Sequence, residues 1–400
     1  MKLGNESGNH LTYCTNIHPG ERWTEVRSNL EHYLPLIKKL VSPNGPFGVG
    51  LRLSAIAASE LQGKDTLEEF KAFLHANDLY VFTINGFAYG PFNGVPVKEE
   101  VYLPDWRSEK RLEYTNILAE ILAQLLTSKS MGYGSISTVP GGFKPHIKSA
   151  SDIEQMTNLL LRHTAYLIGL ERQTGVHLSL ALEPEPCCFI ETIEETISFF
   201  ENHIFSSAAC GQLGDLVGLS FKEAELALRR HVGICLDLCH AAVEYEDPNI
   251  CLDQISRSGI SICKMQISSG LRIPIVTDNI VESLRPFHNS VYLHQVVEQS
   301  PRGLRRFLDL PQAFQAISSK DELREWRVHF HVPVFLNDLA AFSTTQSFIC
   351  EVLGRHRIQS ISSHLEVETY TWDVLPEVYR NCDLTTAIAR ELQWTKAQLA

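Results

Sequence analysis

The residues best suited to chemistry in this sequence are acids that stand at the ends of short apolar runs. Glu183 ends the run HLSLALE, Asp237 ends VGICLD with His240 three residues later, and Glu366 and Glu368 end SISSHLEVE. If these runs are neighbouring parallel strands, their carboxyl ends meet at one edge, and carboxylates that close repel unless a cation joins them. Oxygen ligands with an occasional nitrogen suit Mn²⁺, Mg²⁺, Co²⁺ or Zn²⁺. The pattern therefore predicts a divalent metal site.

Each acid also has a simpler interpretation. Glu183 is placed to be a first-turn acid of the next helix, and Asp237 with His240 is typical of a helix cap followed by a surface histidine. Glu366 and Glu368 alternate as the solvent face of an edge strand would. Their shared position at the ends of three different runs nevertheless favours one common site.

The elements that must position these residues alternate between strand-like runs and stretches with helical periodicity. The strand-like runs cover residues 11–16, 47–53, 79–85, 133–139, 177–183, 232–237, 260–267 and 360–368. Parallel neighbours need crossover helices, and eight such repeats close a (β/α)₈ barrel. A doubly wound open sheet is the main rival, but no Gly-x-Gly-x-x-Gly follows the first run. We predict an α/β fold, a (β/α)₈ TIM barrel, as a single domain over residues 1–400.

Two insertions interrupt the regular spacing of the barrel. Residues 86–106 follow the third run, and 270–335 follow the seventh. Within the second insertion, 291–296 and 304–310 are predicted to form a hairpin that turns at the segment SPRG, and 327–334 is predicted to be a further strand. One of these strands is an alternative to the eighth barrel strand.

The composition excludes several classes of protein. The 35 Lys and Arg against 47 Asp and Glu give a net charge of −12, which disfavours nucleic-acid binding. No apolar run reaches the roughly 18 residues of a membrane span, and the polar N-terminus does not resemble a signal peptide. Ten cysteines without a Cys-x-x-Cys motif indicate buried free thiols, so we expect a cytoplasmic protein.

A set of phrases in chain order resembles a known superfamily. The acids at the fifth, sixth and eighth strand ends are similar to those of the xylose-isomerase-like TIM barrels, which include sugar isomerases, epimerases and the endonuclease IV group. Within that superfamily the chain most resembles the EboE family of metabolite traffic proteins. The phrases are LTYCTNIHPGE, FAYGPFNG, VYLPDW, STVPGGFK, LEPEP, CLDLCH, YLHQV, RVHFHVPV and HLEVETYTW.

The resemblance implies a metal-ligand set at the mouth of the barrel. By position, Glu183, Asp237 and Glu368 match the acids that hold the metal in the ketose epimerases of this superfamily. Gln266 stands where those enzymes carry a histidine, and its amide oxygen is a weaker, neutral ligand. His331 is expected to complete the set.

The resemblance also implies residues that contact the substrate. His240 and Arg272 match substrate-binding positions, and His240 is expected to take part in catalysis. His329 and His331 stand where endonuclease-like members carry additional ligands, and strand alternation places both on one side. A solvent-facing histidine pair is the alternative.

Two further residues are assigned to the barrel mouth from their positions in the chain. His18 follows the first strand, and Lys144 lies in the GGFK segment. We expect both to bind an anionic group there. A surface position is the alternative for each, and the first insertion is expected either to cover the pocket or to pack on the rim.

The function implied is isomerisation or epimerisation of a small sugar-like or polyol metabolite. Glu183 and Glu368 are the expected acid–base pair, with a divalent metal (Mn, Zn, Mg or Co) as cofactor. Two alternatives are open: a non-catalytic metabolite-binding barrel that serves traffic and contacts export-system proteins, and a metal-dependent hydrolase of the endonuclease kind. Because the acidic charge counts against DNA, we expect a small-molecule metabolite as the partner.

Overall fold

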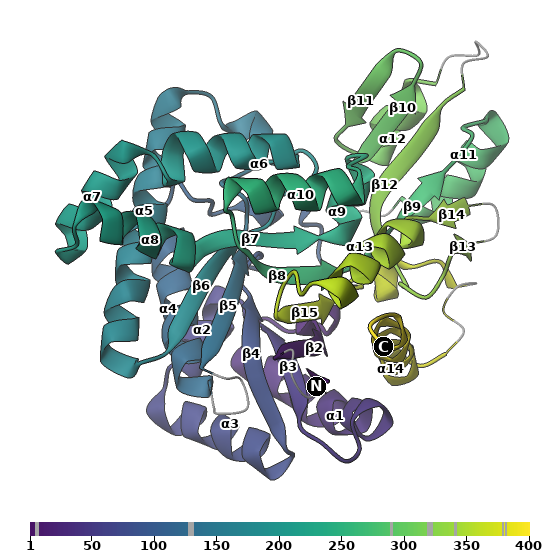
Figure 1. Ribbon diagram of the computed structural model, residues 1–400. Coiled ribbons are helices and arrows are strands. Elements are labelled where there is room, and N and C mark those ends of the chain that lie inside the picture. The colour runs from purple at the N-terminus through teal and green to yellow at the C-terminus, as the bar shows by residue number, and fades with distance from the viewer. Residues whose placement is uncertain are drawn as a thin grey trace.

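The strands of this protein form one large sheet whose order follows the chain. The computed structural model describes residues 1–4, 8–126, 132–288, 291–317, 323–339, 342–377, 380 and 382–400. In these ranges the large sheet has the order β1-β2-β15-β8-β7-β6-β5-β4-β3 (Figure 1). Its strands are β1 Lys2–Leu3, β2 Asn9–Tyr13, β3 Phe47–Arg52, β4 Leu79–Asn85, β5 Tyr133–Thr138, β6 His177–Leu182, β7 Val232–Asp237, β8 Ile262–Ile267 and β15 His364–Val367.

The large sheet curves until its two edges meet as a barrel. Strands β2 to β8 and β15 pair in parallel, and β1 adds to β2 in antiparallel fashion. Cys14, which follows β2, forms a parallel bridge with Gly50 on β3 and brings the edges together. Each of the eight predicted runs overlaps one of these parallel strands. The (β/α)₈ barrel is therefore confirmed, and the doubly wound alternative is wrong.

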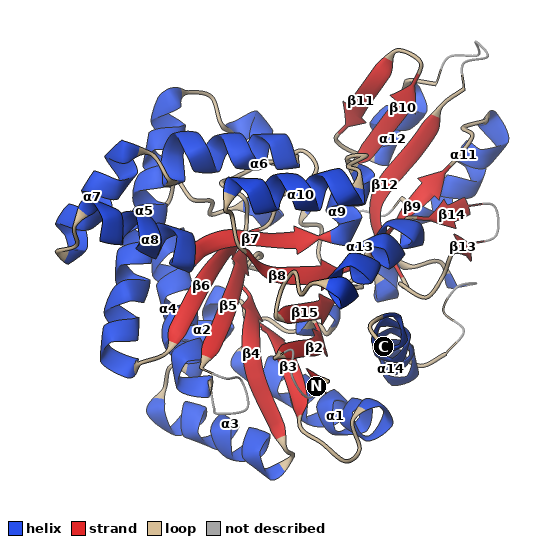
Figure 2. Ribbon diagram, viewed as in Figure 1, coloured by secondary structure: helices blue, strands red, loops and turns tan. Residues whose placement is uncertain are grey.

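Helices surround the barrel and follow most of its strands (Figure 2). Their bounds are α1 Trp23–Val41, α2 Ala55–Leu61, α3 Lys64–Ala76, α4 Glu109–Leu125, α5 Ala150–Thr174, α6 Ile193–Phe199, α7 Ser207–Val217, α8 Phe221–His231, α9 Leu238–Val243, α10 Pro248–Ser258, α11 Asp278–Leu284, α12 Leu310–Gln315, α13 Gln346–Ile358 and α14 Leu384–Gln398. Local sequence sets their ends. Ser149 caps α5 by accepting the N–H of Asp152, and Gly175 ends that helix at a φ of 73°.

The second insertion forms a separate antiparallel sheet beside the barrel mouth. Its order is β11-β10-β12-β9-β14-β13 among the residues that the structure describes. The strands are β9 Ser269–Ile273, β10 Val296–Ser300, β11 Gly303–Phe307, β12 Glu325–Val332, β13 Asp338–Leu339 and β14 Phe342–Thr344. Because β9 follows β8 after one residue, the second sheet is attached directly to a barrel strand.

The predicted hairpin is present, but its first strand is shifted along the chain. Ser300 pairs with Gly303 as expected, and Gly303 has a φ of 104° that suits glycine at the turn. The strand β10 begins at Val296, where the predicted strand 291–296 ends, so that prediction is wrong. Pairing of β10 with both β11 and β12 sets the register.

Two properties of the described chain are the state of its cysteines and the apolarity of its helices. All ten cysteines lie in the described ranges, none forms a disulfide, and eight of them are buried. Among the described residues, no helix is both long and apolar enough to cross a membrane.

A buried ion pair fills the barrel interior below the mouth. Lys264 on β8 contacts Glu366 on β15 at 2.6 Å, and both side chains are fully buried. Although burial alone would lower it, the Glu366 carboxylate raises the pKa of Lys264 above its usual value. Gly50 makes room for this pair, because a Cβ at that position would lie 2.0 Å from Oε2 of Glu366 and 2.7 Å from the carbonyl oxygen of Tyr13.

We expect Gly50→Ala to lower the free energy of unfolding by about 1–3 kcal/mol or more, as overpacking of a tight core does. The matched control is Gly211→Ala in α7, where an added Cβ meets no described atom within 4 Å. That change should stabilise the helix by roughly 0.5–1 kcal/mol. Urea unfolding of both variants measures the difference, and equal stabilities would contradict the close contact at Gly50.

Candidate active site

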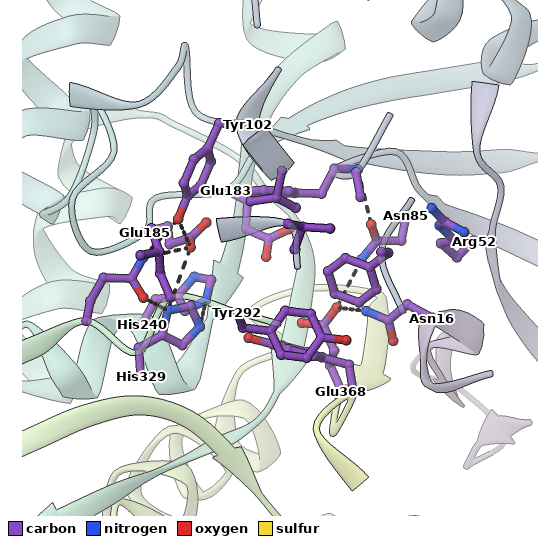
Figure 3. Close-up of a pocket in the computed structure, with 18 of the residues that line it drawn as sticks. Asn16, Arg52, Asn85, Tyr102, Glu183, Glu185, His240, Tyr292, His329 and Glu368 are labelled. Atoms are coloured by element: carbon purple, nitrogen blue, oxygen red, sulfur yellow. Dashed lines mark hydrogen bonds and ion pairs between the residues drawn. The ribbon is translucent and has the colours of Figure 1, made fainter. Parts of the chain in front are cut away.

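A pocket opens at the carboxyl ends of the barrel strands, between the barrel and the two insertions (Figure 3). It encloses about 600 Å³ of empty space, counted out to the solvent. Its lining includes the acids Glu183, Glu185 and Glu368. The other lining residues are Asn16, Arg52, Asn85, Phe87, Ala88, Phe92, Val97, Lys98, Val101, Tyr102, His240, Tyr292, Leu293, Gln295, His329 and Tyr370.

Glu183 lies directly after β6 and is buried at the mouth. It does not cap the next helix, because α6 begins at Ile193 with Thr192 as its cap. Its Oε2 has no hydrogen-bond partner within the described residues. Burial, and then repulsion from Asp237, raises the pKa of Glu183 well above its usual value. The first-turn interpretation of Glu183 is therefore wrong.

Asp237 serves both the helix and the pocket. Its Oδ1 accepts hydrogen bonds from the backbone N–H of His240 at 2.9 Å and from the hydroxyl of Ser268 at 2.7 Å, so it does cap α9. Its Oδ2 is buried and has no partner in the described part of the chain. Although burial opposes the shift, the nearby imidazoles of His240 and His331 and these hydrogen bonds lower the pKa of Asp237. The free oxygen is available to a ligand.

Glu368 faces the same space from the other side of the pocket (Figure 3). Its Oε1 accepts hydrogen bonds from the side-chain amides of Asn16 at 2.8 Å and Asn85 at 3.0 Å. Glu366 and Glu368 are both buried, and β15 lies between β2 and β8, so the solvent-face alternative is wrong. Burial, and then repulsion from Glu183, raises the pKa of Glu368 well above its usual value.

In each of three buried histidines, the N–H of Nδ1 donates a hydrogen bond to an oxygen. His240 donates to the carbonyl oxygen of Pro184 at 3.0 Å, and His331 donates to the carbonyl oxygen of Glu368 at 2.8 Å. These acceptors carry no proton, so Nδ1 must be the donor in both rings. When the rings are neutral, Nε2 of His240 and Nε2 of His331 therefore each carry a free lone pair.

His329 has the same tautomer for a related reason. Its Nδ1 lies 2.9 Å from Oε1 of Gln295. The orientation of that amide follows from its Nε2, which faces the carbonyl oxygen of Pro186 at 3.2 Å and the carboxylate of Glu185 at 3.4 Å. The glutamine oxygen must then accept from His329. The alternative of a solvent-facing histidine pair is wrong, because His329 and His331 are buried.

These tautomers bring lone pairs face to face. Nε2 of His240 lies 3.0 Å from Nε2 of His329, with the other nitrogen of each ring already a donor. One ligand nitrogen from each of His240, His329 and His331 lies within 4.8 Å of the other two. Nitrogens that share a tetrahedral Zn²⁺ are about 3.3 Å apart. The arrangement fits a divalent cation, with a carbonyl oxygen that accepts from Nδ1 and so holds each ring in place.

The acids extend this donor set toward the barrel. Ligand atoms of Glu183, Asp237 and His240 lie within 4.8 Å of one another, and so do those of Asp237, Cys239 and His331. Asp237 thus belongs to both groups. The unpartnered carboxylate oxygens and imidazole nitrogens together suit Zn²⁺ or Mn²⁺. Because the groups share Asp237, His240 and His331, they form one connected set of donors for a cation.

A β-bulge places the two histidines of the insertion. Strand β12 pairs with β9 through Val328 and Leu271 and again through Val332 and Ser269, so two extra residues on β12 lie between the pairs. The bulged segment contains His329 and is held by its N–H, which donates to the carbonyl oxygen of Gln295. Bulges of this kind re-aim side chains toward sites.

Gln266 does not act as the sequence predicts. Its Oε1 accepts the thiol proton of Cys235 at 3.1 Å, and it is absent from the described lining of the pocket. Ser268, two residues further along the chain, makes the contact with Asp237 instead. The expected ligand role of Gln266 is therefore corrected, and the imidazoles of His329 and His331 supply nitrogen donors in its place.

Two of the expected binding residues, Arg272 and Lys144, lie elsewhere. Arg272 is on β9, where its guanidinium makes two hydrogen bonds to Glu325 at 2.8 and 3.0 Å. Lys144 pairs with Glu191 and with Glu195. Because these ion pairs occupy both cations and neither residue lines the described pocket, their assignment to substrate binding is corrected.

His18 is likewise held away from the pocket. Its Nε2 is 2.9 Å from the hydroxyl of Tyr13, and its ring stacks on Tyr33 with centroids 4.1 Å apart. Burial lowers the pKa of His18 to about 3, so the ring is neutral and does not attract an anion. The expected role of His18 is corrected for this reason.

One acid of the site was not assigned from the sequence. Glu185 accepts a hydrogen bond from the hydroxyl of Tyr102 at 2.7 Å, and its Oε1 lies 3.6 Å from Nδ1 of His329. Burial raises the pKa of Glu185 to about 8. The signal was present in the phrase LEPEP, where a second acid follows the strand-end acid after one proline.

Both insertions contribute to an aromatic cover over the acids. Phe92 from the first insertion packs against Tyr292 at a centroid distance of 5.3 Å and against Tyr370 at 5.2 Å. Trp106 does not line the pocket and donates instead to the hydroxyl of Thr138 at 3.1 Å. The first insertion therefore both covers the pocket and packs against the barrel.

Comparisons with known proteins show what the fold is. Neither a protein-family model nor a curated protein matches the sequence. A xylose isomerase domain protein from Planctomyces limnophilus is 12% identical over 91% of each chain, with a TM-score of 0.50. D-psicose 3-epimerase from Clostridium cellulolyticum H10 is 12% identical over 98% of each chain (TM-score 0.46), and the zinc-bound IolI protein is 12% identical over 98% of this chain and 97% of its own (TM-score 0.45). The fold of the chain is a TIM barrel, similar to that of the xylose isomerase domain protein.

We expect metal-stripped His329→Gln to bind one equivalent of zinc fewer than the wild type, because the substitution takes away a nitrogen donor of the three-histidine cluster. Gln295→Leu should weaken zinc binding about 10–100-fold, because the His329 ring loses the hydrogen bond that orients it. The control is the exposed His75→Gln. Isothermal titration with Zn²⁺ alone measures all three, and equal affinity in His329→Gln and the wild type would contradict the cluster.

Proposed function

We propose that this protein is a divalent-metal-dependent isomerase or epimerase of a small, uncharged sugar-like or polyol metabolite. The observation that carries the proposal is the pair of buried carboxylates, Glu183 and Glu368, that face one space from strands three places apart in the barrel. The sheet order β15-β8-β7-β6 puts two strands between them. A carbon held in that space has an acid–base group on each of two faces.

The two carboxylates are suited to moving a proton between those faces. Epimerisation needs one group to take the proton from carbon and a second to return a proton on the opposite side. Burial, and then repulsion from Asp237 at Glu183 and from Glu183 at Glu368, raises the pKa values of both acids, which favours their protonated forms. Asn16 and Asn85 hold the Glu368 carboxylate in place through its Oε1.

The neighbouring donors would hold a divalent cation, which would supply positive charge next to a substrate carbonyl oxygen. Asp237, with the unpartnered Oε2 of Glu183 and the lone pairs of His240 and His331, would hold it. Asp237 and His240 are themselves oriented by Ser268 and by the carbonyl oxygen of Pro184. The aromatic cover of Phe92, Tyr292 and Tyr370 keeps bulk water from the space between the acids.

The pocket favours a neutral polyol over a phosphorylated sugar. Its cations are already paired: Arg52 contacts Glu21 at 3.0 Å, and Lys98 contacts Asp309 at 2.7 Å. Both also donate to backbone carbonyl oxygens. A phosphate entering this pocket would have to displace those acids. The remaining groups, amides and aromatic rings, suit hydroxyls and the apolar face of a sugar.

Features of the same site favour two other candidate functions. The nitrogen of His329, which the cation described above does not use, favours a second cation, and two cations are a feature of many metal-dependent hydrolases. The covered pocket is also suited to a metabolite-binding role without turnover, as in the EboE-like traffic proteins, with export-system proteins as partners and a cytoplasmic location. The experiment below separates these.

We expect the protein with Mn²⁺ or Zn²⁺ to exchange deuterium from solvent into the carbon next to the carbonyl of a ketohexose such as fructose, psicose or tagatose. Glu183→Gln and Glu368→Gln should each lower the exchange at least 100-fold, in line with loss of a general acid–base group. Lys144→Ala, outside the pocket, is the matched control and should keep it. NMR of the recovered sugar measures the label.

The outcomes distinguish the candidate functions. Exchange that needs metal and both acids supports the isomerase or epimerase. Sugar binding by calorimetry without exchange supports the traffic role. Cleavage of an abasic-site oligonucleotide, lost in His329→Gln, supports the hydrolase.

A further inference from the structure

A second cluster of metal-ligating residues lies at the opposite end of the barrel from the pocket. It joins Glu171 on α5, His177 at the start of β6 and His231 at the end of α8. One ligand atom from each residue lies within 4.8 Å of the other two. Glu183 follows the other end of β6, six residues from His177, which is about 20 Å along a strand. The two clusters are therefore separate.

The His231 ring presents a lone pair to Glu171. Its Nδ1 donates to the carbonyl oxygen of Leu178 at 2.8 Å, and a carbonyl can only accept. Its Nε2 lies 3.2 Å from Oε2 of Glu171. When the ring is neutral, the lone pair on Nε2 faces the carboxylate oxygen, and the two acceptors have no proton between them. Burial, first among the causes, lowers the pKa of His231 and so favours the neutral ring.

The His177 ring is held in the complementary way. The hydroxyl of Ser179 donates to the carbonyl oxygen of Arg230 at 3.0 Å, so its oxygen is left to accept from Nε2 of His177 at 3.2 Å. Nδ1 of His177 is then a lone pair, buried and without a hydrogen-bond partner among the described residues. It lies 3.8 Å from the same Oε2 of Glu171. Burial lowers the pKa of His177 to about 4.

Glu171 divides its two oxygens between different partners. Oε1 pairs with the guanidinium of Arg230, whereas Oε2 faces both imidazoles. Two lone pairs and one carboxylate oxygen thus converge, and the tautomers leave no proton to bridge them. Donors on one tetrahedral Zn²⁺ are about 3.3–3.5 Å apart, which the distances of 3.2 and 3.8 Å bracket.

We propose that Glu171, His177 and His231 form a second divalent-metal site that takes Zn²⁺, with solvent in the remaining position. The ligand set of two imidazoles and one carboxylate suits Zn²⁺ better than the oxygen-seeking Mg²⁺ or Ca²⁺. The carbonyl oxygen of Leu178 and the hydroxyl of Ser179 hydrogen-bond to the rings of His231 and His177 and fix their orientation. Glu171 and His177 are partly exposed, so the metal reaches the site from solvent.

This metal joins three elements at the amino-terminal face of the barrel. It ties the end of α5 and the end of α8 to the first residue of β6, the strand that carries Glu183 at its other end. Groups on that face of a TIM barrel contribute to stability, whereas catalysis uses the other face. The expected effect of the second site is therefore on thermal stability, independent of the proposed reaction.

The test uses the full chain with the mouth cluster disabled. In the double variant Asp237→Asn and His240→Gln, which takes a donor from each of the three donor groups at the mouth, we expect one Zn²⁺ per chain to remain after stripping, reloading with Zn²⁺ alone and desalting, as measured by atomic emission. Adding His177→Gln should remove that zinc and abolish the zinc-dependent rise in Tm, because the stabilisation follows from binding to the folded state. Adding His75→Gln is the matched control and should change neither.

Either of two results overturns the second site: no zinc in the double variant, or the same zinc content with and without His177→Gln. Circular dichroism checks that each variant folds. If His177→Gln does not fold, Glu171→Gln in the same double variant replaces it, and retained zinc there also overturns the proposal. Activity plays no part in these readouts, so a failure of the proposed isomerase leaves the outcome unaffected.

Discussion

The structure depends on how buried negative charge is accommodated at the mouth of the barrel. Glu183, Asp237, Glu366 and Glu368 are all buried there, and Lys264 contacts only the deepest of them, Glu366, among the described residues. The ion pair of Lys264 with Glu366 fills the barrel interior. A glycine is needed at position 50 because a Cβ there would clash with the Glu366 carboxylate. Burial and repulsion raise the pKa values of Glu183 and Glu368, whereas nearby imidazoles and hydrogen bonds lower that of Asp237. A cation beside these acids would relieve the repulsion between them.

The histidines show how an insertion changes a barrel site. The barrel supplies His240 from the first turn after β7, while His329 and His331 come from a bulge in the second sheet. Each ring is held by an acceptor from a different part of the chain: Pro184, Gln295 and the backbone of Glu368. The insertion therefore does more than cover the pocket. It adds imidazole nitrogen donors to an oxygen-rich site, which shifts the metal preference toward Zn²⁺.

Parts of the site could be predicted because they follow from local order along the chain. Acids at strand ends must share the mouth once the strands are parallel, so Glu183 and Glu368 were placed correctly in the pocket. The assignments of Gln266 and Arg272 failed because they rested on counting along β8 and β9. There the chain leaves the barrel for the second sheet, and Arg272 meets Glu325 on a neighbouring strand instead of the pocket. Counting residues along a strand cannot predict that Arg272 will pair with an acid more than fifty residues away in the sequence.

By itself the sequence determined the alternation of eight strands and helices, the closed barrel that this implies, and which acids stand at strand ends. These follow from periodicity and from the requirement that parallel strands have crossover helices. Only the tertiary structure decided which nitrogen of each histidine is free, because a tautomer depends on the acceptor that the other nitrogen meets. The same holds for Glu171, His177 and His231, which form a cluster because α5, β6 and α8 pack together, and no spacing between them in the chain marks a common ligand.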